Sequence, residues 1–162
     1  MTTTLHTLVW ASMLTKAIRE AETRVSLTAL SFLPPRREKS DDFGDLFRAI
    51  RAGIKKGVEV RIIMPGSHIA NPATLGNTRT GNHLLEEGCT VVLRKSPYLL
   101  HAKTAVIDHK SAWVGSGNFT AAAAHFNREC WLETDDQKCV ADLLSYHDYL
   151  MMTANPRGWS EP

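Results

Sequence analysis

A histidine and a lysine stand two residues apart in the stretch HAKTAVIDHKSAWVGSGNFT, residues 101–120. Alternate side chains of a β-strand share a face, so His101 and Lys103 are expected to meet one ligand while Asp108 points away. Imidazole can act as a nucleophile or move a proton, and an ammonium can hold an anion. The pair therefore predicts chemistry on a negatively charged group, and Asp108 is expected to organise the turn after the strand.

A second polar set lies in the predicted strand SAWVGSGN. Ser116 and Asn118 have matching parity, and Gly115 and Gly117 leave no side chain in the way of a close ligand. A helix that starts at FTAAAA would turn free N–H groups to the same place, and helix N-termini attract anions. Together these groups indicate phosphate as the ligand.

The two sets combine into the pattern H-x-K-x4-D-x6-G-S-x-N, formed by His101, Lys103, Asp108, Gly115, Ser116 and Asn118. This pattern resembles the signature of the phospholipase D superfamily. From about residue 24 to residue 150, the order of elements and the NRE at 127–129 are also similar to the small bacterial endonucleases of that superfamily. The resemblance implies a phospholipase D-like fold with one motif per chain.

The resemblance also implies a mechanism, in which His101 attacks phosphorus to form a covalent phosphohistidine and a second motif histidine protonates the leaving oxygen. Because one chain holds one motif, a two-fold homodimer must bring two copies of His101 together. Lys103 and Asn118 would hold phosphate oxygens. Ser116 would donate to phosphate or to a neighbouring motif residue, and Glu129 would orient the histidine. No metal or other cofactor is implied.

Other residues that could carry chemistry are better explained by structure. The remaining histidines lack metal-ligand spacing and are expected at the surface or in packing: His6, His68, His83, His109, His125 and His147. The pairs 41–42 and 135–136 are aspartates that each precede a predicted helix, which favours capping. Trp113 and Trp131 are expected in the core or at a dimer contact.

Apolar spacing predicts a fold of alternating helices and strands. Helices are expected over residues 12–23, with Ser12 as a candidate N-cap, and over 43–57, 78–88 and 136–152. Strands are expected over 24–33, 58–65, 89–94, 101–108, 111–118 and 128–134, and a long loop over 66–77. The strand, helix, strand order predicts an α/β fold: a mixed, largely parallel sheet flanked by helices on both faces.

Length and composition favour one domain. The chain has 162 residues, of which 43% are hydrophobic and 22% charged, and we expect one domain over 1–162 with its core in 24–150 and peripheral ends at 1–23 and 151–162. The three cysteines are expected as free or buried thiols. There is no long apolar stretch and no basic region before the apolar N-terminal segment, so we expect a cytoplasmic protein without membrane insertion.

The sequence favours nucleic acid as the substrate. The net charge of +2 is only mildly basic, but the segments PPRREK, RAIRAGIKKG and NTRTGNH are locally basic. The prediction is therefore a metal-independent nuclease that hydrolyses DNA or RNA. Two alternatives stay open: a lipid phosphodiesterase, for which KSPYLL could form a hydrophobic lip, and a non-catalytic nucleic-acid-binding module on the same fold.

Overall fold

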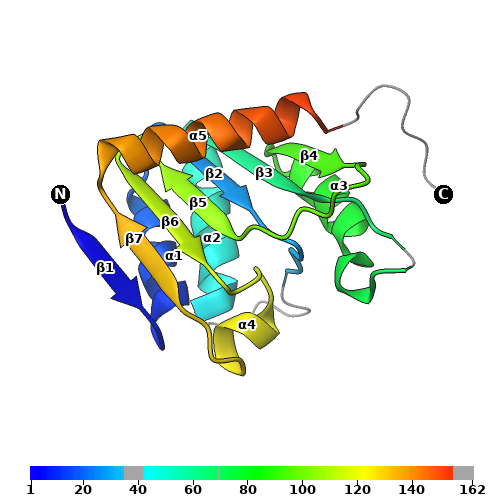
Figure 1. The fold of residues 1–162 in the computed structure, drawn as a ribbon, viewed down its shortest axis with the longest axis horizontal. Helices are drawn as coiled ribbons and strands as arrows, with labels where there is room; N and C mark the ends of the chain where they lie inside the picture. Colours follow the sequence, from blue (N-terminus) through cyan, green and yellow to red (C-terminus); the bar gives the residue numbers. More distant parts are fainter. Residues whose placement is uncertain (35–41, 69, 155–162) are drawn as a thin grey trace.

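The computed structural model describes residues 1–34, 42–68 and 70–154. Within them, seven strands form one sheet: β1 (Thr3–His6), β2 (Arg24–Thr28), β3 (Glu59–Pro65), β4 (Thr90–Arg94), β5 (Thr104–Ile107), β6 (Ser111–Gly115) and β7 (Trp131–Thr134). The helices are α1 (Trp10–Glu20), α2 (Asp42–Lys55), α3 (Asn77–Glu86), α4 (Ala121–His125) and α5 (Gln137–Met152), with a 3-10 turn, η1, at Pro72–Thr74. The sheet has the order β1-β7-β6-β5-β2-β3-β4 (Figure 1).

The sheet is mixed, as predicted, but it is not largely parallel. Only β2–β3 and β3–β4 are parallel pairs, while β2–β5, β5–β6, β6–β7 and β1–β7 are antiparallel. One of the antiparallel pairs, β5–β6, is joined by a short turn in which Asp108 and His109 have φ of 52° and 57°. A turn this short can join only antiparallel strands, because a parallel pair needs a long crossover. The parallel half and the antiparallel half meet between β2 and β5.

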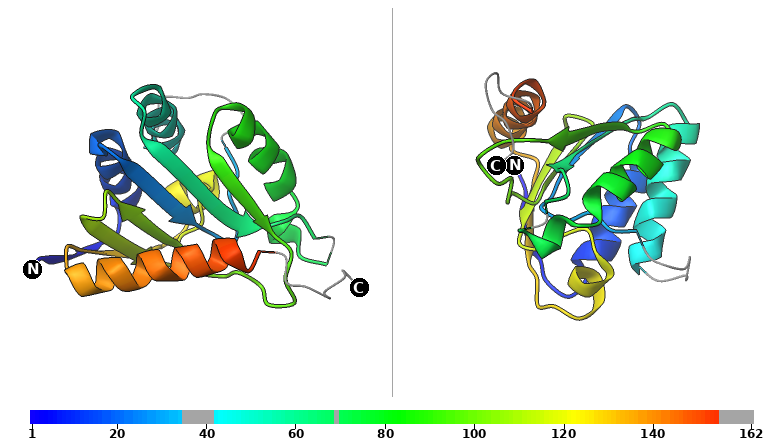
Figure 2. Two further views of the ribbon diagram at one scale, coloured as in Figure 1. Left: turned by 90° about the horizontal axis from the view of Figure 1, so that it is seen from above. Right: turned by 90° about the vertical axis from the view of Figure 1, so that its right-hand side faces the viewer.

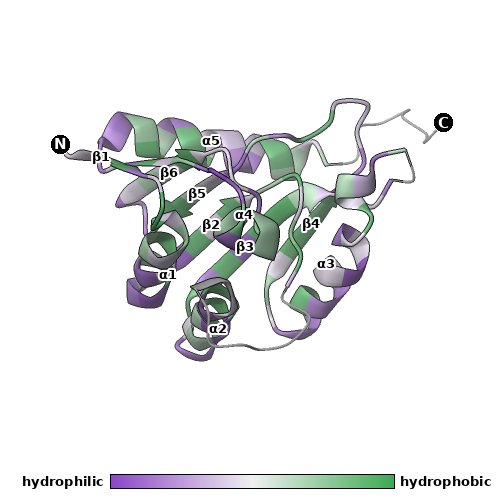
Figure 3. Ribbon diagram, turned by 90° about the horizontal axis from the view of Figure 1, so that it is seen from below, coloured by the Kyte–Doolittle hydropathy of each residue, from purple (hydrophilic) through white to green (hydrophobic). Residues whose placement is uncertain are grey.

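Helices cover both faces of the sheet, which confirms that part of the prediction. Helices α1, α2 and α3 lie on one face, and α5 crosses the other (Figure 2). The strands between the three helices are strongly hydrophobic, whereas the outer sides of the helices are hydrophilic (Figure 3). Burial of this shared apolar layer is the main force that holds the helices on the sheet.

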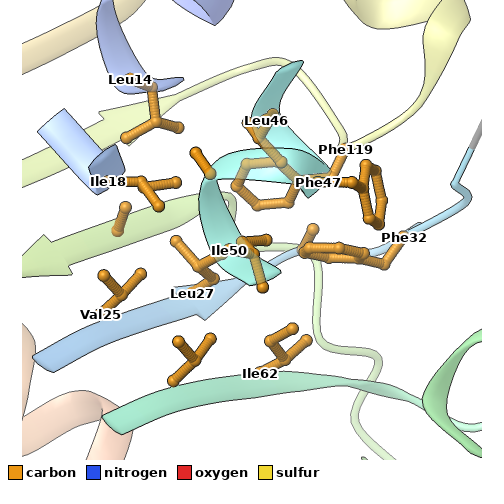
Figure 4. Close-up of a cluster of buried hydrophobic side chains, with 14 of the residues drawn as sticks. Leu14, Ile18, Val25, Leu27, Phe32, Leu46, Phe47, Ile50, Ile62 and Phe119 are labelled. Carbon is orange, nitrogen blue, oxygen red and sulfur yellow. The ribbon is translucent and has the colours of Figure 1, made fainter. Parts of the chain in front are cut away.

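The main core lies between the sheet and helices α1 and α2. Leu14 and Ile18 of α1 pack with Leu27 of β2 and Ile50 of α2 (Figure 4). In addition, β1 pairs with β7 at the edge of the sheet. The prediction that residues 1–23 are peripheral is therefore wrong, because the apolar face of α1 is needed to close the core. Residues 155–162 lie outside the described residues.

Two predicted helix caps have different outcomes. Asp136 caps α5 by accepting the backbone N–H of Cys139 at 2.8 Å, as predicted. Ser12 does not cap α1, because the helix begins earlier, at Trp10, and Ser12 donates instead to the carbonyl of Val9 at 3.0 Å. Residue 41 and the side chain of residue 42 lie outside the described part of the chain.

Two histidines and two tryptophans pack inside the protein, as expected. His6 is buried, stacks on Trp113 and lies 2.8 Å from a carboxylate oxygen of Glu133. The ring nitrogens of buried His147 hydrogen-bond the hydroxyls at positions 26 and 104, at 2.7 Å each. Trp113 and Trp131 are buried in the core. All three cysteines are free thiols, and Cys89 is buried.

Within residues 1–34, 42–68 and 70–154, no helix combines the length and apolar character that a membrane span requires.

Candidate active site

The predicted site residues gather at one end of the central strands, where β2 ends and β5 begins. His101 and Lys103 lie just before β5, because the strand starts only at Thr104. Asn118 follows β6, and its side-chain oxygen accepts the backbone N–H of Ser31, the segment after β2, at 3.1 Å. The backbone of Phe119 also donates to the carbonyl of Ser31 at 3.1 Å. These bonds hold the segments after β2 and β6 together at the site.

His101 and Lys103 share a face and are in contact, as the spacing predicts. Nζ of Lys103 lies 3.0 Å from Nδ1 of His101 and donates to the carbonyl of His101 at 2.6 Å. Lys103 is 5% exposed, whereas His101 is exposed. An ammonium has donors only, so a hydrogen bond between the two groups uses the ring nitrogen as the acceptor. The arrangement presents an accessible imidazole backed by a buried cation.

The pKa of Lys103 is lowered mainly by burial, and the nearby carboxylate of Glu129 opposes this shift. An ammonium inside a poorly hydrated site attracts an anion more strongly than one in water. The charges at this edge are therefore arranged to hold a negatively charged group beside His101.

Ser116 and Glu129 form a second cluster. The hydroxyl of Ser116 donates to one carboxylate oxygen of Glu129 and accepts the backbone N–H of Cys130 at 3.2 Å. The side-chain amide of Asn127 donates to the other carboxylate oxygen at 3.0 Å. In the described residues of this chain, Glu129 makes no hydrogen bond to His101. Ser116 was predicted to donate to phosphate or to a neighbouring motif residue, but its hydroxyl donates to Glu129, which lies outside the motif. The predicted orienting bond from Glu129 to His101 is not observed.

The glycines of the motif make room for an aromatic ring rather than for a ligand. A methyl group at Gly115 would lie 2.3 Å from the indole of Trp131, and one at Gly117 would lie 3.0 Å from Trp131 Nε1. Trp131 is fully buried. Its Nε1 has no hydrogen-bond partner among the described residues. The prediction that Gly115 opens the backbone to phosphate is corrected, because the space beside it is filled by the core.

Asp108 is structural, as predicted, but through different partners. Its carboxylate accepts backbone N–H groups of residues 22, 23 and 24, and the hydroxyl of Thr23, at 2.7 to 2.9 Å. Burial alone would raise the pKa of Asp108, but these hydrogen bonds outweigh it and hold the pKa below its usual value. Asp108 therefore fastens the β5–β6 turn to the α1–β2 connection instead of only organising its own turn.

The helix after the motif is a weaker anion site than expected. α4 has five residues, and the backbone N–H of Ala123 is used by the hydroxyl of Thr120 at 3.2 Å. Part of the free N–H set that the sequence suggested is therefore satisfied within the helix cap. Phosphate binding at this edge depends mainly on the side chains.

Sequence reasoning missed the residues that tie the site together. Asn77 is buried, and its side-chain amide donates to the carbonyls of Leu30 and Pro65 at 2.8 and 2.9 Å, which joins the ends of β2 and β3. Asn127 supports Glu129 in the same way. The available signals were weak: Asn77 follows a glycine in a predicted loop, and Asn127 stands two residues before Glu129.

Two curated proteins are similar to most of this chain. Cardiolipin synthase A from Buchnera aphidicola is 29% identical over 146 residues, which cover 88% of this chain and 28% of that protein. Mitochondrial cardiolipin hydrolase from Homo sapiens is 27% identical over 146 residues, which cover 90% of this chain and 52% of that protein. The chain thus spans from about a quarter to about half of the length of these curated relatives.

Two solved structures share the fold over nearly their whole length. Nuc from Salmonella typhimurium, a phospholipase D family member, has a TM-score of 0.74 at 21% identity and matches 94% of this chain and 95% of that one. NucT from Helicobacter pylori has a TM-score of 0.67 at 24% identity, over 94% and 96%. Residues 14–151 match the family model described as "Cardiolipin synthase, PLD-like domain". The chain belongs to the phospholipase D-like superfamily of phosphodiesterases.

Proposed function

We propose that the protein is a metal-independent nuclease that cleaves DNA or RNA through a covalent phosphohistidine in a homodimeric site. The observation that carries the proposal is the contact of exposed His101 with the buried ammonium of Lys103, 3.0 Å from ring to Nζ. This pair offers a nucleophile and an anion-binding charge in one place. Asn118 stands at the same end of the strands, and its side-chain amide can donate a further hydrogen bond to a phosphate group, whereas the hydroxyl of Ser116 already donates to Glu129.

In the proposed reaction, a neutral His101 attacks phosphorus and a P–N bond forms. The bond from phosphorus to the leaving oxygen breaks, and that oxygen takes a proton from the His101 of a second protomer. Water then attacks the phosphohistidine, gives a proton to the second histidine and releases the phosphate product. The two copies of Lys103 hold the equatorial oxygens and stabilise their growing charge, so the scheme requires no metal ion.

One exposed surface suits the second protomer. Leu5, Leu132 and Val114 are direct cross-strand partners on β1, β7 and β6, so their side chains form one row on one face of the sheet. They are 62%, 41% and 50% exposed. The row lies beside the site, because Val114 directly precedes the Gly115 to Asn118 segment. A second copy that covers this row would bury apolar surface and bring its own catalytic edge close by.

Nucleic acid is the favoured substrate for two reasons. The sequence resembles the small bacterial endonucleases of the superfamily in its motif and its NRE segment, and Nuc and NucT match this chain over 95% and 96% of their own lengths. In addition, Arg79 and Arg128 are exposed and make no ion pair with the described residues, so they are available to a phosphate backbone. The RAIRAGIKKG segment gives less support, since Arg51 is paired with Glu87 at 2.7 Å. Most of PPRREK lies outside the described residues.

Lipid hydrolysis is the second candidate. It is favoured by the curated relatives, whose names describe cardiolipin synthesis and hydrolysis, and by the exposed apolar side chains of Tyr98 and Leu99 close to His101 in the chain. A module that binds nucleic acid without cutting it is less well supported, because the His101–Lys103 pair is intact. One experiment separates the three.

The test is digestion of plasmid and of single-stranded DNA and RNA oligonucleotides in excess chelator, with and without His101→Ala. We expect the wild type to cut and His101→Ala to be inactive. His83→Ala, which changes a histidine on α3, should cut like the wild type and shows that the loss is specific to His101. A contaminating nuclease would leave the His101→Ala preparation active. Activity that disappears with chelator and returns with magnesium would refute the mechanism. Headgroup release from phosphatidylglycerol vesicles, without cutting of nucleic acid, would favour the lipid candidate.

A further inference from the structure

A pocket of about 410 Å³ adjoins the proposed site. It lies between the segment that follows β3 and the connection from β4 to β5, which are joined where Gly66 donates to the carbonyl of Arg94 at 3.0 Å. Its wall reaches Leu100, the residue directly before His101. The Cα atoms of this wall residue and of the proposed nucleophile are about 3.8 Å apart, because the two residues are consecutive in the chain. It is large enough for a group attached to the phosphate that His101 attacks.

The pocket wall combines flat apolar surface with free hydrogen-bonding groups. Tyr98 lines it with a ring that is 84% exposed, so one face of the ring is open to a ligand. Nδ1 of His68 accepts the backbone N–H of Ala70 at 3.2 Å, and the side-chain oxygen of Asn71 accepts that of Ala73 at 3.3 Å. Nε2 of His68 and Nδ2 of Asn71 have no hydrogen-bond partner among the described residues.

We propose that this pocket binds the nucleobase of the nucleotide next to the scissile phosphate, with the base stacked on Tyr98. This inference rests on the proposed nuclease function and names the part of the substrate that the phosphate site does not hold. A base has a flat aromatic face for Tyr98 and polar edges for His68 and Asn71. An acyl chain would cover the free polar groups of His68 and Asn71 without replacing their hydrogen bonds to water, which is unfavourable.

The experiment measures binding rather than cleavage, so that it does not depend on turnover. The His101→Ala protein is titrated with a fluorescent tetrathymidylate and with an analogue of equal length and charge that has abasic sites. We expect the intact oligonucleotide to bind about 5- to 150-fold more tightly than the abasic analogue, because stacking of one base on an aromatic ring contributes a gain of this size. Adding Tyr98→Ala should remove the difference, and Tyr98→Phe should keep it. Tyr149→Ala, which changes an exposed tyrosine on α5 outside the pocket wall, is the matched control.

Each outcome distinguishes the pocket from the reaction. Equal affinity for the two oligonucleotides, or a preference that survives Tyr98→Ala, would overturn the base pocket. If the wild type still cuts both oligonucleotides in chelator at equal rates, the nuclease function stands and the pocket fails. A base preference that depends on Tyr98 in a protein without nuclease activity would keep the pocket and reject the reaction. If the protein sediments with phosphatidylglycerol vesicles in a way that depends on Tyr98, and shows no base preference, the proposal is also overturned. Tyr98 would then contact lipid instead of a base.

Discussion

The carboxylate of Asp108 accepts the backbone N–H of Thr23 at 2.7 Å, across 85 positions of sequence. Through this bond and the bonds to residues 22 and 24, Asp108 joins the β5–β6 turn to the α1–β2 connection. None of its hydrogen bonds in the described residues reaches His101 or Lys103. The motif therefore contains residues with different roles: His101 and Lys103 form the proposed phosphate site, Gly115 makes room for Trp131, and Asp108 holds the β5–β6 turn at the other end of the strand.

We expect Asp108→Asn to lower stability while leaving the chemistry largely intact. The substitution keeps the shape but replaces one acceptor oxygen by a donor that faces backbone N–H groups, which costs about 1–3 kcal/mol. In a chain of this size each kcal/mol lowers the Tm by about 2–4 °C. Thermal unfolding measures the loss, and activity is assayed well below the Tm. An unchanged Tm together with abolished activity would instead give Asp108 a chemical role.

Lys103→Met should reduce kcat by about 10²- to 10³-fold, because it removes a charge that stabilises the transition state while preserving the buried alkyl stem. Lys103→Arg is not expected to restore the rate, since a planar guanidinium does not fit the position of a buried ammonium. Lys110→Met, which removes an exposed lysine paired with Glu22, serves as the control. Steady-state kinetics on an oligonucleotide provide the measurement, and a Lys103→Met protein with normal kcat would exclude this role.

Leu132→Asp should produce an inactive monomer if the row of Leu5, Leu132 and Val114 is the dimer surface. A carboxylate in the middle of the row would have to be buried in the interface, which is unfavourable. Sedimentation should give the wild type about twice the 18.0 kDa chain mass and the variant about one chain mass. Leu75→Asp changes a similarly exposed leucine outside the row and should remain dimeric. An active wild-type monomer would contradict the shared-site mechanism.

We expect the buried His147 to lower the free energy of unfolding as the pH falls from 6.5 toward 4. Burial lowers the pKa of His147 from 6.5 to about 4, and the nearby Asp148 opposes the shift weakly. Between these two values the unfolded state binds more protons than the folded state, so stability is fully present above pH 6.5 and falls as the pH drops toward 4. The full loss is about 3 kcal/mol. Urea unfolding at several pH values should show this decline in the wild type.

His147→Gln provides the comparison, because a neutral amide can still hydrogen-bond the hydroxyls of Ser26 and Thr104 but does not titrate. Its stability should change much less between pH 6.5 and 4. Asp108 has a lowered pKa, so its contribution to stability is lost only when the pH falls below the usual pKa of an aspartate. The two residues therefore affect stability over different pH ranges. Parallel curves for the two proteins would show that His147 is not the source.

The sequence predicted well the features that depend on local spacing. Strand parity placed His101 and Lys103 on one face, although the strand itself begins only at Thr104. The alternation of helices and strands gave the mixed sheet with helices on both faces. These features follow from the geometry of a few consecutive residues, so a single chain is sufficient to infer them.

The features that depend on distant residues were not predictable. Nothing near Gly115 shows that the indole of Trp131 occupies the space beside it, and nothing near Asp108 points to residues 22–24. The parallel character of the sheet was overestimated for a similar reason: only β5 and β6 are joined by a short turn, and the antiparallel pairing of β5 with β2 and of β6 with β7 is fixed only in three dimensions. Tertiary contacts decided each of these points.

Trp131 links the amino-terminal helix to the segment that bears Ser116. Its indole stacks on Trp10 at 5.2 Å and fills the space beside Gly115 and Gly117. A displacement of α1 would therefore shift the indole of Trp131 and, through it, the segment that bears Ser116 and its partner Glu129. Removal of the first twenty residues would expose this ring to water, so the opening segment supports the packing behind the proposed site although it carries none of its side chains.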